Sequence, residues 1–69
     1  MIRIGIYGYG NLGRGVESAI MQNSDMELVA VFTRRDPSTV KLINKNVPVY
    51  KTEDALNMTD KIDVMILCG

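Results

Sequence analysis

Several residue types that build common sites are scarce or missing. Among the 69 residues there is no histidine and no tryptophan, and there are only one cysteine and two prolines. A single cysteine cannot form an internal disulfide, and without histidine it lacks the usual partner for a zinc site. We therefore expect no metal and a reducing, cytoplasmic setting.

An excess of one charge and long apolar runs are also lacking. Eight basic and eight acidic side chains give a formal net charge of zero, so no overall field favours nucleic acid or an anionic membrane. The longest apolar runs, residues 28–32 and 64–68, have five residues each, whereas a membrane-spanning helix needs about 20. No basic segment precedes an apolar core at the start of the chain, so we expect no secretion.

The spacing of apolar residues changes within the first part of the chain. Ile2, Ile4 and Ile6 recur at every second position, which predicts a strand. The next apolar residues follow the spacing of one helix face: Leu12, Val16, Ala19 and Ile20. The order is therefore strand, glycine-rich turn, helix.

Strand and helix patterns continue to alternate along the rest of the chain. Further strands are predicted at residues 27–32, 47–50 and 62–68, with a helix over 37–44 that Asp36 caps and a helical turn that Thr52 caps. Such alternation predicts parallel βαβ units with right-handed crossovers. We expect an α/β fold, the first half of a Rossmann-type doubly wound parallel sheet with strand order 3-2-1-4.

The predicted fourth strand has an unpaired and mostly apolar outer edge. Such an edge favours aggregation unless another strand or chain covers it. We therefore interpret residues 1–69 as the N-terminal piece of a longer protein.

The glycine turn fits the dinucleotide fingerprint G-x-G-x-x-G between a strand and a helix. Its residues are Gly8, Tyr9, Gly10, Asn11, Leu12 and Gly13. Gly8 allows the tight turn, Gly10 lets the backbone approach a pyrophosphate, and Gly13 permits close packing of the helix on the sheet. The N–H groups at the helix start would face the phosphates. The alternative is a turn that serves packing only.

Two arginines stand where an acid often binds the ribose of NAD. About 20 residues beyond the glycines, NAD sites carry Asp or Glu, whereas NADP sites use arginine for the 2′-phosphate. This sequence has Thr33, Arg34 and Arg35 there, and its nearest acid, Asp36, is assigned to helix capping. The arginines could be ordinary loop charges, but their position after the second strand favours NADP.

The end of the chain carries Leu67, Cys68 and Gly69, at the strand edge where such sheets bind ligands. A cysteine there is more often a small packing residue than a nucleophile, and no histidine is available to activate it.

Four segments together are similar to the N-terminal part of the meso-diaminopimelate dehydrogenases. The segments are IGIYGYGNLGRGVE, LVAVFTRRDP, VPVY and DVMILCG, in this order. The resemblance implies that the glycine turn holds the pyrophosphate, that Thr33, Arg34 and Arg35 hold the 2′-phosphate of NADP, and that the LCG segment runs toward the nicotinamide. It also implies that residues 1–69 are the N-terminal part of a dinucleotide-binding domain, and that the catalytic and substrate-binding residues would lie in a substrate and dimerisation domain absent from this chain.

The resemblance also implies an activity. The intact enzyme would be a cytoplasmic homodimer that catalyses NADP-dependent, reversible oxidative deamination of the D-centre of meso-2,6-diaminopimelate, in lysine and cell-wall precursor biosynthesis. The products would be L-2-amino-6-oxopimelate and ammonia, and the 69 residues alone are expected to be inactive. Two alternatives remain open: another NAD(P)-dependent dehydrogenase of the homoserine or aspartate type, and a dinucleotide-sensing Rossmann module without catalysis.

Overall fold

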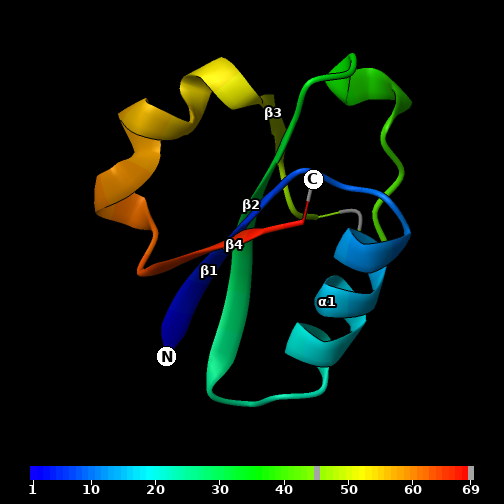
Figure 1. Cartoon of the computed structure of the whole chain (residues 1–69). Coiled ribbons are helices and arrows are strands. Elements are labelled where there is room, and N and C mark those ends of the chain that lie inside the picture. The colour runs from blue at the N-terminus through cyan, green and yellow to red at the C-terminus, as the bar shows by residue number, and fades with distance from the viewer. Residues whose placement is uncertain (45, 69) are drawn as a thin grey trace.

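The computed structural model describes residues 1–44 and 46–68, which form one small α/β unit (Figure 1). Along the chain its elements are β1 (Ile2–Tyr7), α1 (Asn11–Met21), β2 (Met26–Thr33), the 3₁₀ helix η1 (Pro37–Thr39), β3 (Val49–Lys51), the 3₁₀ helix η2 (Thr52–Lys61) and β4 (Val64–Leu67). All strand pairs are parallel, and the sheet order is β3-β2-β1-β4. The predicted fold and strand order are confirmed.

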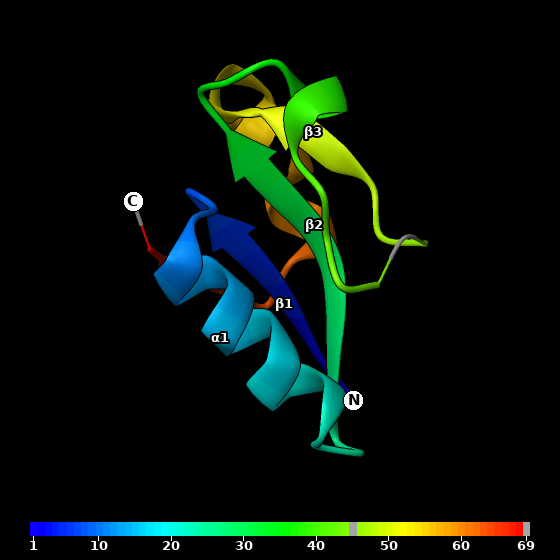
Figure 2. The ribbon, with the colours of Figure 1, turned by 90° about the vertical axis from the view of Figure 1, so that its right-hand side faces the viewer.

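The sheet is covered differently on its two faces. Figure 1 shows α1 on one side of the sheet and η2 on the other, and the rotated view of Figure 2 places α1 in front of the strands with η2 behind them. The crossover from β1 to β2 therefore passes over one face, and the crossover from β3 to β4 passes over the opposite face. This arrangement is that of a doubly wound sheet.

The larger core lies between α1, the inner strands and the segment before β3. Its buried side chains are Ile4, Ile6, Ile20, Leu28, Val31, Leu42 and Val47. Phe32 lies outside this cluster, is completely buried, and stacks on Tyr50 with ring centroids 5.9 Å apart. The second face therefore has its own aromatic contact between β2 and β3.

Two predicted helices differ from the structure. Residues 37–44 form only the short helix η1, because the backbone N–H groups of Ile43 and Asn44 donate to the buried Glu17 carboxylate instead of to helical carbonyls. The predicted Thr52 cap is wrong, since Lys51 occupies the N-cap position of η2 and makes no side-chain cap bond. The helix continues to Lys61, well beyond the single turn expected.

The strands of the sheet begin and end close to the predicted positions. β2 extends from Met26 to Thr33, one residue beyond the predicted range at each end. β3 starts at Val49, directly after Pro48, which cannot donate to a strand neighbour.

No helix within residues 1–44 and 46–68 combines the length and the apolar character needed to cross a membrane.

An ion pair fixes the start of β4 to β1. Arg3 donates from Nη2 to Asp63 Oδ1 at 3.0 Å, and from Nε and its backbone N–H to Oδ2 at 3.1 and 2.9 Å. These hydrogen bonds lower the pKa of Asp63 from 3.8 to about 2. Because the folded-state pKa is depressed, the stabilisation is complete above pH 3.8 and is lost as the pH falls through about 2.

We expect Asp63→Asn to have a lower melting temperature than the parent at neutral pH, and the difference to shrink as the pH falls from 3.8 toward 2. Thermal unfolding of both chains across this range measures it. Asp60→Asn is the matched control, because Asp60 is an exposed acid in the preceding helix and makes no comparable bonds among the described residues. A melting difference for Asp63→Asn that stayed constant down to pH 2 would contradict the assignment.

Candidate dinucleotide site

A cavity of about 350 Å³ opens at the carboxyl ends of the inner strands. Its lining residues are Tyr7, Gly8, Tyr9, Thr33, Arg34, Arg35, Thr52 and Leu67. They come from the ends of β1, β2 and β4, the turn after β1, the loop after β2 and the start of η2. Ligands of open α/β sheets bind at this edge, where neighbouring crossovers go to opposite faces. A larger hollow of about 540 Å³ lies at the other end of the sheet, beside the end of α1 and the start of β2, away from the glycine turn.

The glycine turn has the backbone that its sequence requires. Gly8 has φ +89°, a left-handed conformation that side chains rarely adopt, and its N–H donates to the Phe32 carbonyl at 2.8 Å. At Gly10 a Cβ atom would meet nothing within 4 Å, so open space lies in front of this residue. The absence of a side chain there leaves a surface that a ligand can approach closely.

At the start of α1, backbone N–H groups lack an acceptor within the helix. Gly10 is the N-cap and supplies no side-chain cap, and the first turn holds no acidic residue. The first intrahelical bond of the turn runs from Arg14 N–H to the Gly10 carbonyl at 2.9 Å, so the amides of Asn11, Leu12 and Gly13 have no carbonyl behind them in the helix. Such amides, with the positive end of the helix dipole, suit a phosphate.

Gly13 is needed for close packing, but its neighbour is the turn rather than the strands. A Cβ at this position would lie 3.1 Å from the Gly8 carbonyl oxygen and 3.2 Å from Cδ1 of Tyr9. At Gly15, in the same helix, a Cβ would meet nothing within 4 Å. A side chain at Gly13 would therefore crowd the glycine turn, whereas one at Gly15 would not.

This contrast gives a matched pair of substitutions. We expect Gly15→Ala to raise the free energy of unfolding by about 0.5–1 kcal/mol, through helix propensity. Gly13→Ala should give no such gain and should weaken dinucleotide binding, because the added methyl pushes the turn away from α1. Denaturant unfolding and ligand titration of both variants measure this. Equal stabilisation by the two substitutions would refute the packing role of Gly13.

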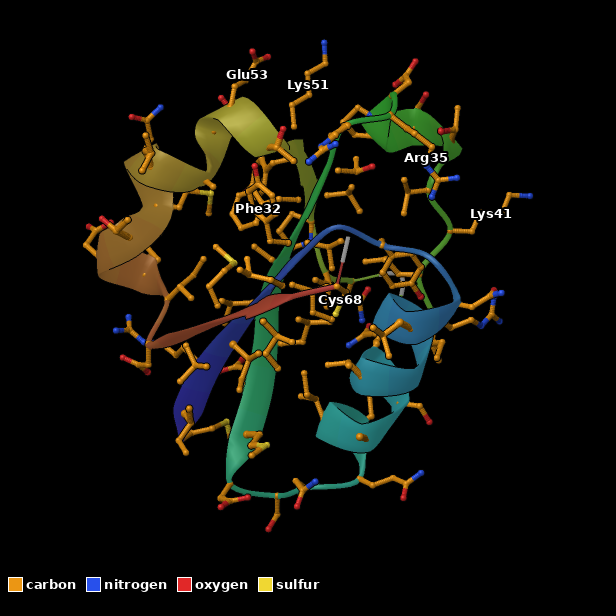
Figure 3. All side chains as sticks on the ribbon, viewed as in Figure 1. Phe32, Arg35, Lys41, Lys51, Glu53 and Cys68 are labelled. Carbon is orange, nitrogen blue, oxygen red and sulfur yellow. The ribbon has the colours of Figure 1, made fainter. Side chains whose placement is uncertain are left out.

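The end of β2 brings Thr33 and Arg35 to the glycine turn. Thr33 is only 2% exposed, and its Oγ1 accepts from the Arg35 N–H at 3.1 Å. Arg35 Nη2 donates to the carbonyl of Tyr9 at 2.9 Å, and Figure 3 shows this side chain reaching from the loop after β2 toward the turn before α1. Arg34 is exposed beside them. The two predicted halves of the site are therefore in direct contact.

Asp36 has the structural role that the sequence predicted. Its carboxylate accepts from the backbone N–H of Ser38 at 3.0 Å and from its hydroxyl at 2.9 Å, which caps η1. These bonds lower the pKa of Asp36 below its ordinary value. The carboxylate is thus occupied by the helix that follows.

Leu67 and Cys68, from the predicted LCG segment, lie in different surroundings. Leu67 lines the cavity and is 75% exposed. Cys68 packs against the larger core, its N–H donates to the Tyr7 carbonyl at 2.9 Å, and burial raises the pKa of its thiol. A raised pKa disfavours the thiolate, which supports a packing role. Gly69 lies outside the described residues.

The other four residues of the glycine turn do not line this cavity; they are Gly10, Asn11, Leu12 and Gly13. Across residues 1–44 and 46–68, no cluster of three or more acidic or cysteine side chains could hold a metal ion.

Two residues that the sequence did not assign to the site also belong to this region. Thr52 lines the cavity from the start of η2, directly after β3 ends. Glu17 is completely buried and accepts a hydrogen bond from the Tyr9 hydroxyl at 2.7 Å. The available signal for Glu17 was its place one residue after Val16 and three before Ile20, on the apolar face of the helix, where an acid is unusual.

Comparison with known proteins agrees with this architecture. A family model described as "Dihydrodipicolinate reductase, N-terminus" matches residues 2–66. The meso-diaminopimelate D-dehydrogenase of Ureibacillus thermosphaericus is 71% identical over 68 residues, and that of Lysinibacillus sphaericus is also 71% identical over 68 residues. In both cases the match covers 99% of this chain and 21% of the relative. The chain therefore spans about a fifth of the length of these relatives.

Two solved structures extend the comparison to the fold. A meso-diaminopimelate dehydrogenase mutant from Clostridium tetani E88, with diaminopimelate, superposes with a TM-score of 0.81 at 54% identity, over 100% of this chain and 21% of that one. An engineered D-amino acid dehydrogenase bound to NADP⁺ gives 0.82 at 44% identity, over 99% of this chain and 20% of that one. The resemblance seen in the sequence is confirmed, and the chain belongs to the family described as "Dihydrodipicolinate reductase, N-terminus".

Proposed function

We propose that this chain forms the NADP-binding part of a meso-diaminopimelate D-dehydrogenase. The complete enzyme would oxidatively deaminate the D-centre of meso-2,6-diaminopimelate and give L-2-amino-6-oxopimelate and ammonia, reversibly. Support comes from relatives of that name at 71% identity and from a similar engineered dehydrogenase with bound NADP⁺. Because the chain covers about a fifth of those proteins, residues elsewhere would bind the substrate.

One observation carries the cofactor assignment: Arg35 Nη2 donates to the Tyr9 carbonyl at 2.9 Å, so the arginine segment and the glycine turn form one wall of one cavity. The amides at the start of α1 would bind the pyrophosphate, and Arg34 and Arg35 would bind the 2′-phosphate. The Thr33 hydroxyl accepts one bond in the protein and retains its proton for a phosphate oxygen. When bound, NADP⁺ supplies the hydride acceptor.

Leu67 would border the cofactor from β4, since it lines the same cavity from the neighbouring strand end. The 69 residues hold no complete substrate site in this proposal, and we expect them to be inactive without the rest of the enzyme. A hydride transfer requires substrate carbon and nicotinamide to be held together in a water-poor site.

The activity is tested with the full-length protein by following NADPH formation. Meso-diaminopimelate with NADP⁺ should give NADPH and ammonia in equal amounts, and NAD⁺ should be a poor substitute. L-Homoserine and L-aspartate are the controls, because related Rossmann dehydrogenases act on them. A faster reaction with either control would contradict the proposed substrate. Tight dinucleotide binding without turnover of any amino acid would instead indicate a sensing module.

We further propose that the complete enzyme is a cytoplasmic homodimer. The single cysteine suits a reducing compartment, and a dimerisation domain accompanies the cofactor domain in the family that the sequence resembles. Sedimentation of the full-length protein should give twice the chain mass. A monomer at micromolar concentration would contradict this.

A further inference from the structure

Glu17 is the most completely buried carboxylate in the described part of the chain, and the proposed cofactor contacts do not use it. Its exposure is 0%. A buried carboxylate is tolerated only when hydrogen bonds replace its lost water. Glu17 obtains them from the Tyr9 hydroxyl and from the backbone N–H groups of Ile43 and Asn44, at 2.7, 3.1 and 2.8 Å. One side chain therefore joins three segments of the fold.

The first of these segments is the glycine turn. Tyr9 lies inside it and is held at three points: its ring packs near Gly13, its hydroxyl donates to Glu17, and its carbonyl accepts from Arg35. Burial, and then the bond to Glu17, raises the pKa of Tyr9 to about 12, so the hydroxyl keeps its proton at physiological pH. The Tyr9 hydroxyl is therefore available as a donor to Glu17 at physiological pH.

The second segment is the loop after β2, which Glu17 holds at its far end. Ile43 and Asn44 donate to the two carboxylate oxygens, and the same loop begins with Arg34 and Arg35. The loop is thus tied to α1 and its turn at both ends, by Arg35 at one and by Glu17 at the other. Figure 3 shows this loop passing beside α1, with Arg35 and Lys41 along it.

We infer that Glu17 is a positioning residue that sets the affinity for the 2′-phosphate, because it keeps the glycine turn and the loop after β2 in a fixed position relative to each other. This inference rests on the proposed NADP site. Glu17 itself lies behind the turn and touches no cofactor atom in this scheme. Loss of its bonds would let Tyr9 and residues 43–44 move independently, and the guanidinium of Arg35 would lose its fixed anchor on the Tyr9 carbonyl.

The test compares adenosine 2′,5′-bisphosphate with adenosine 5′-monophosphate on the full-length protein and its Glu17→Gln variant. Glutamine keeps the size but turns one acceptor oxygen into a donor, which would face the Asn44 or Ile43 N–H. We expect the preference for the bisphosphate to fall about tenfold, as for one buried hydrogen-bond group left unpaired. Tyr9→Phe removes only the hydroxyl and should reduce the preference by roughly threefold. Glu27→Gln, an exposed acid at the opposite end of β2, is the matched control.

The outcomes separate the inference from the proposed function. An unchanged preference in folded Glu17→Gln, even with a lower melting temperature, would show a purely structural role and overturn the inference alone. If that variant does not fold, Tyr9→Phe decides in the same way, because an unchanged preference there would also overturn it. A parent protein with no preference for the bisphosphate would overturn the proposed NADP site, and the inference with it.

Discussion

Replacing Arg34 and Arg35 together by alanine is expected to weaken NADP binding by about 3 kcal/mol or more, roughly a hundredfold, while NAD affinity changes by less than about 1 kcal/mol. The reason is that each guanidinium can make charge-assisted bonds, at about 1.5–3 kcal/mol each, to a 2′-phosphate that NAD lacks. Both side chains line the cavity, and both are exposed enough to meet a ligand. Titration of the full-length double variant with each dinucleotide measures the effect.

Two controls sharpen this result. Lys61→Ala removes an exposed cation at the end of η2, outside the cavity, and should change neither affinity. Raising the salt concentration should reduce the preference of the parent protein for NADP, because exposed ionic contacts are screened. Equal losses of NADP and NAD affinity in the double variant would contradict the 2′-phosphate assignment, since the arginines would then be supporting the turn only.

The largest effect on stability is expected for Phe32→Ala, at about 3–5 kcal/mol. The ring is completely buried at the second face of the sheet and stacks on Tyr50, so truncation removes apolar burial and leaves a cavity. Since small domains have total stabilities of only about 5–15 kcal/mol, this loss would be a large fraction of the total. Urea unfolding of the parent and variant measures the difference.

Phe32→Leu and Tyr50→Leu serve as controls for this substitution. Leucine at position 32 keeps most of the buried volume, so its loss should be clearly smaller than that of alanine. Tyr50→Leu removes the stacking partner while position 32 stays filled, and it reports the aromatic contact, about 0.5–1.5 kcal/mol beyond buried area. A loss below about 1 kcal/mol for Phe32→Ala would contradict this prediction. It would mean that neighbouring side chains move in and fill the cavity.

The parts of the fold that local patterns determine could be predicted. The period of two in β1, the glycine turn and the helical spacing that follows lie within one short stretch, and topology rules then give the strand order. The same rules place the ends of β1, β2 and β4 at one edge. This explains why Gly8, Thr33 and Leu67, far apart in the sequence, line one cavity. That these residues bind the cofactor stays a prediction.

The parts that depend on distant contacts could not be predicted. Asp36 and Pro37 predict a helix over residues 37–44, yet Glu17 takes the N–H groups of Ile43 and Asn44 from 26 and 27 residues away. The local sequence cannot show that a distant carboxylate competes with the helical carbonyls for these N–H groups. The Arg35 bond to the Tyr9 carbonyl is equally invisible, because its acceptor is a backbone atom that any residue would supply.

We propose that Thr33, Arg34 and Arg35 form a 2′-phosphate pocket beside the glycine turn. Calorimetric titration of the unmodified full-length protein with adenosine 2′,5′-bisphosphate and adenosine 5′-monophosphate, at one fixed low salt concentration, tests it most directly, because both ligands need only this half of the site. We expect the bisphosphate to bind at least about a hundredfold more tightly. Equal affinities in a folded protein would contradict the pocket. The arginines would then be ordinary charged residues of a loop.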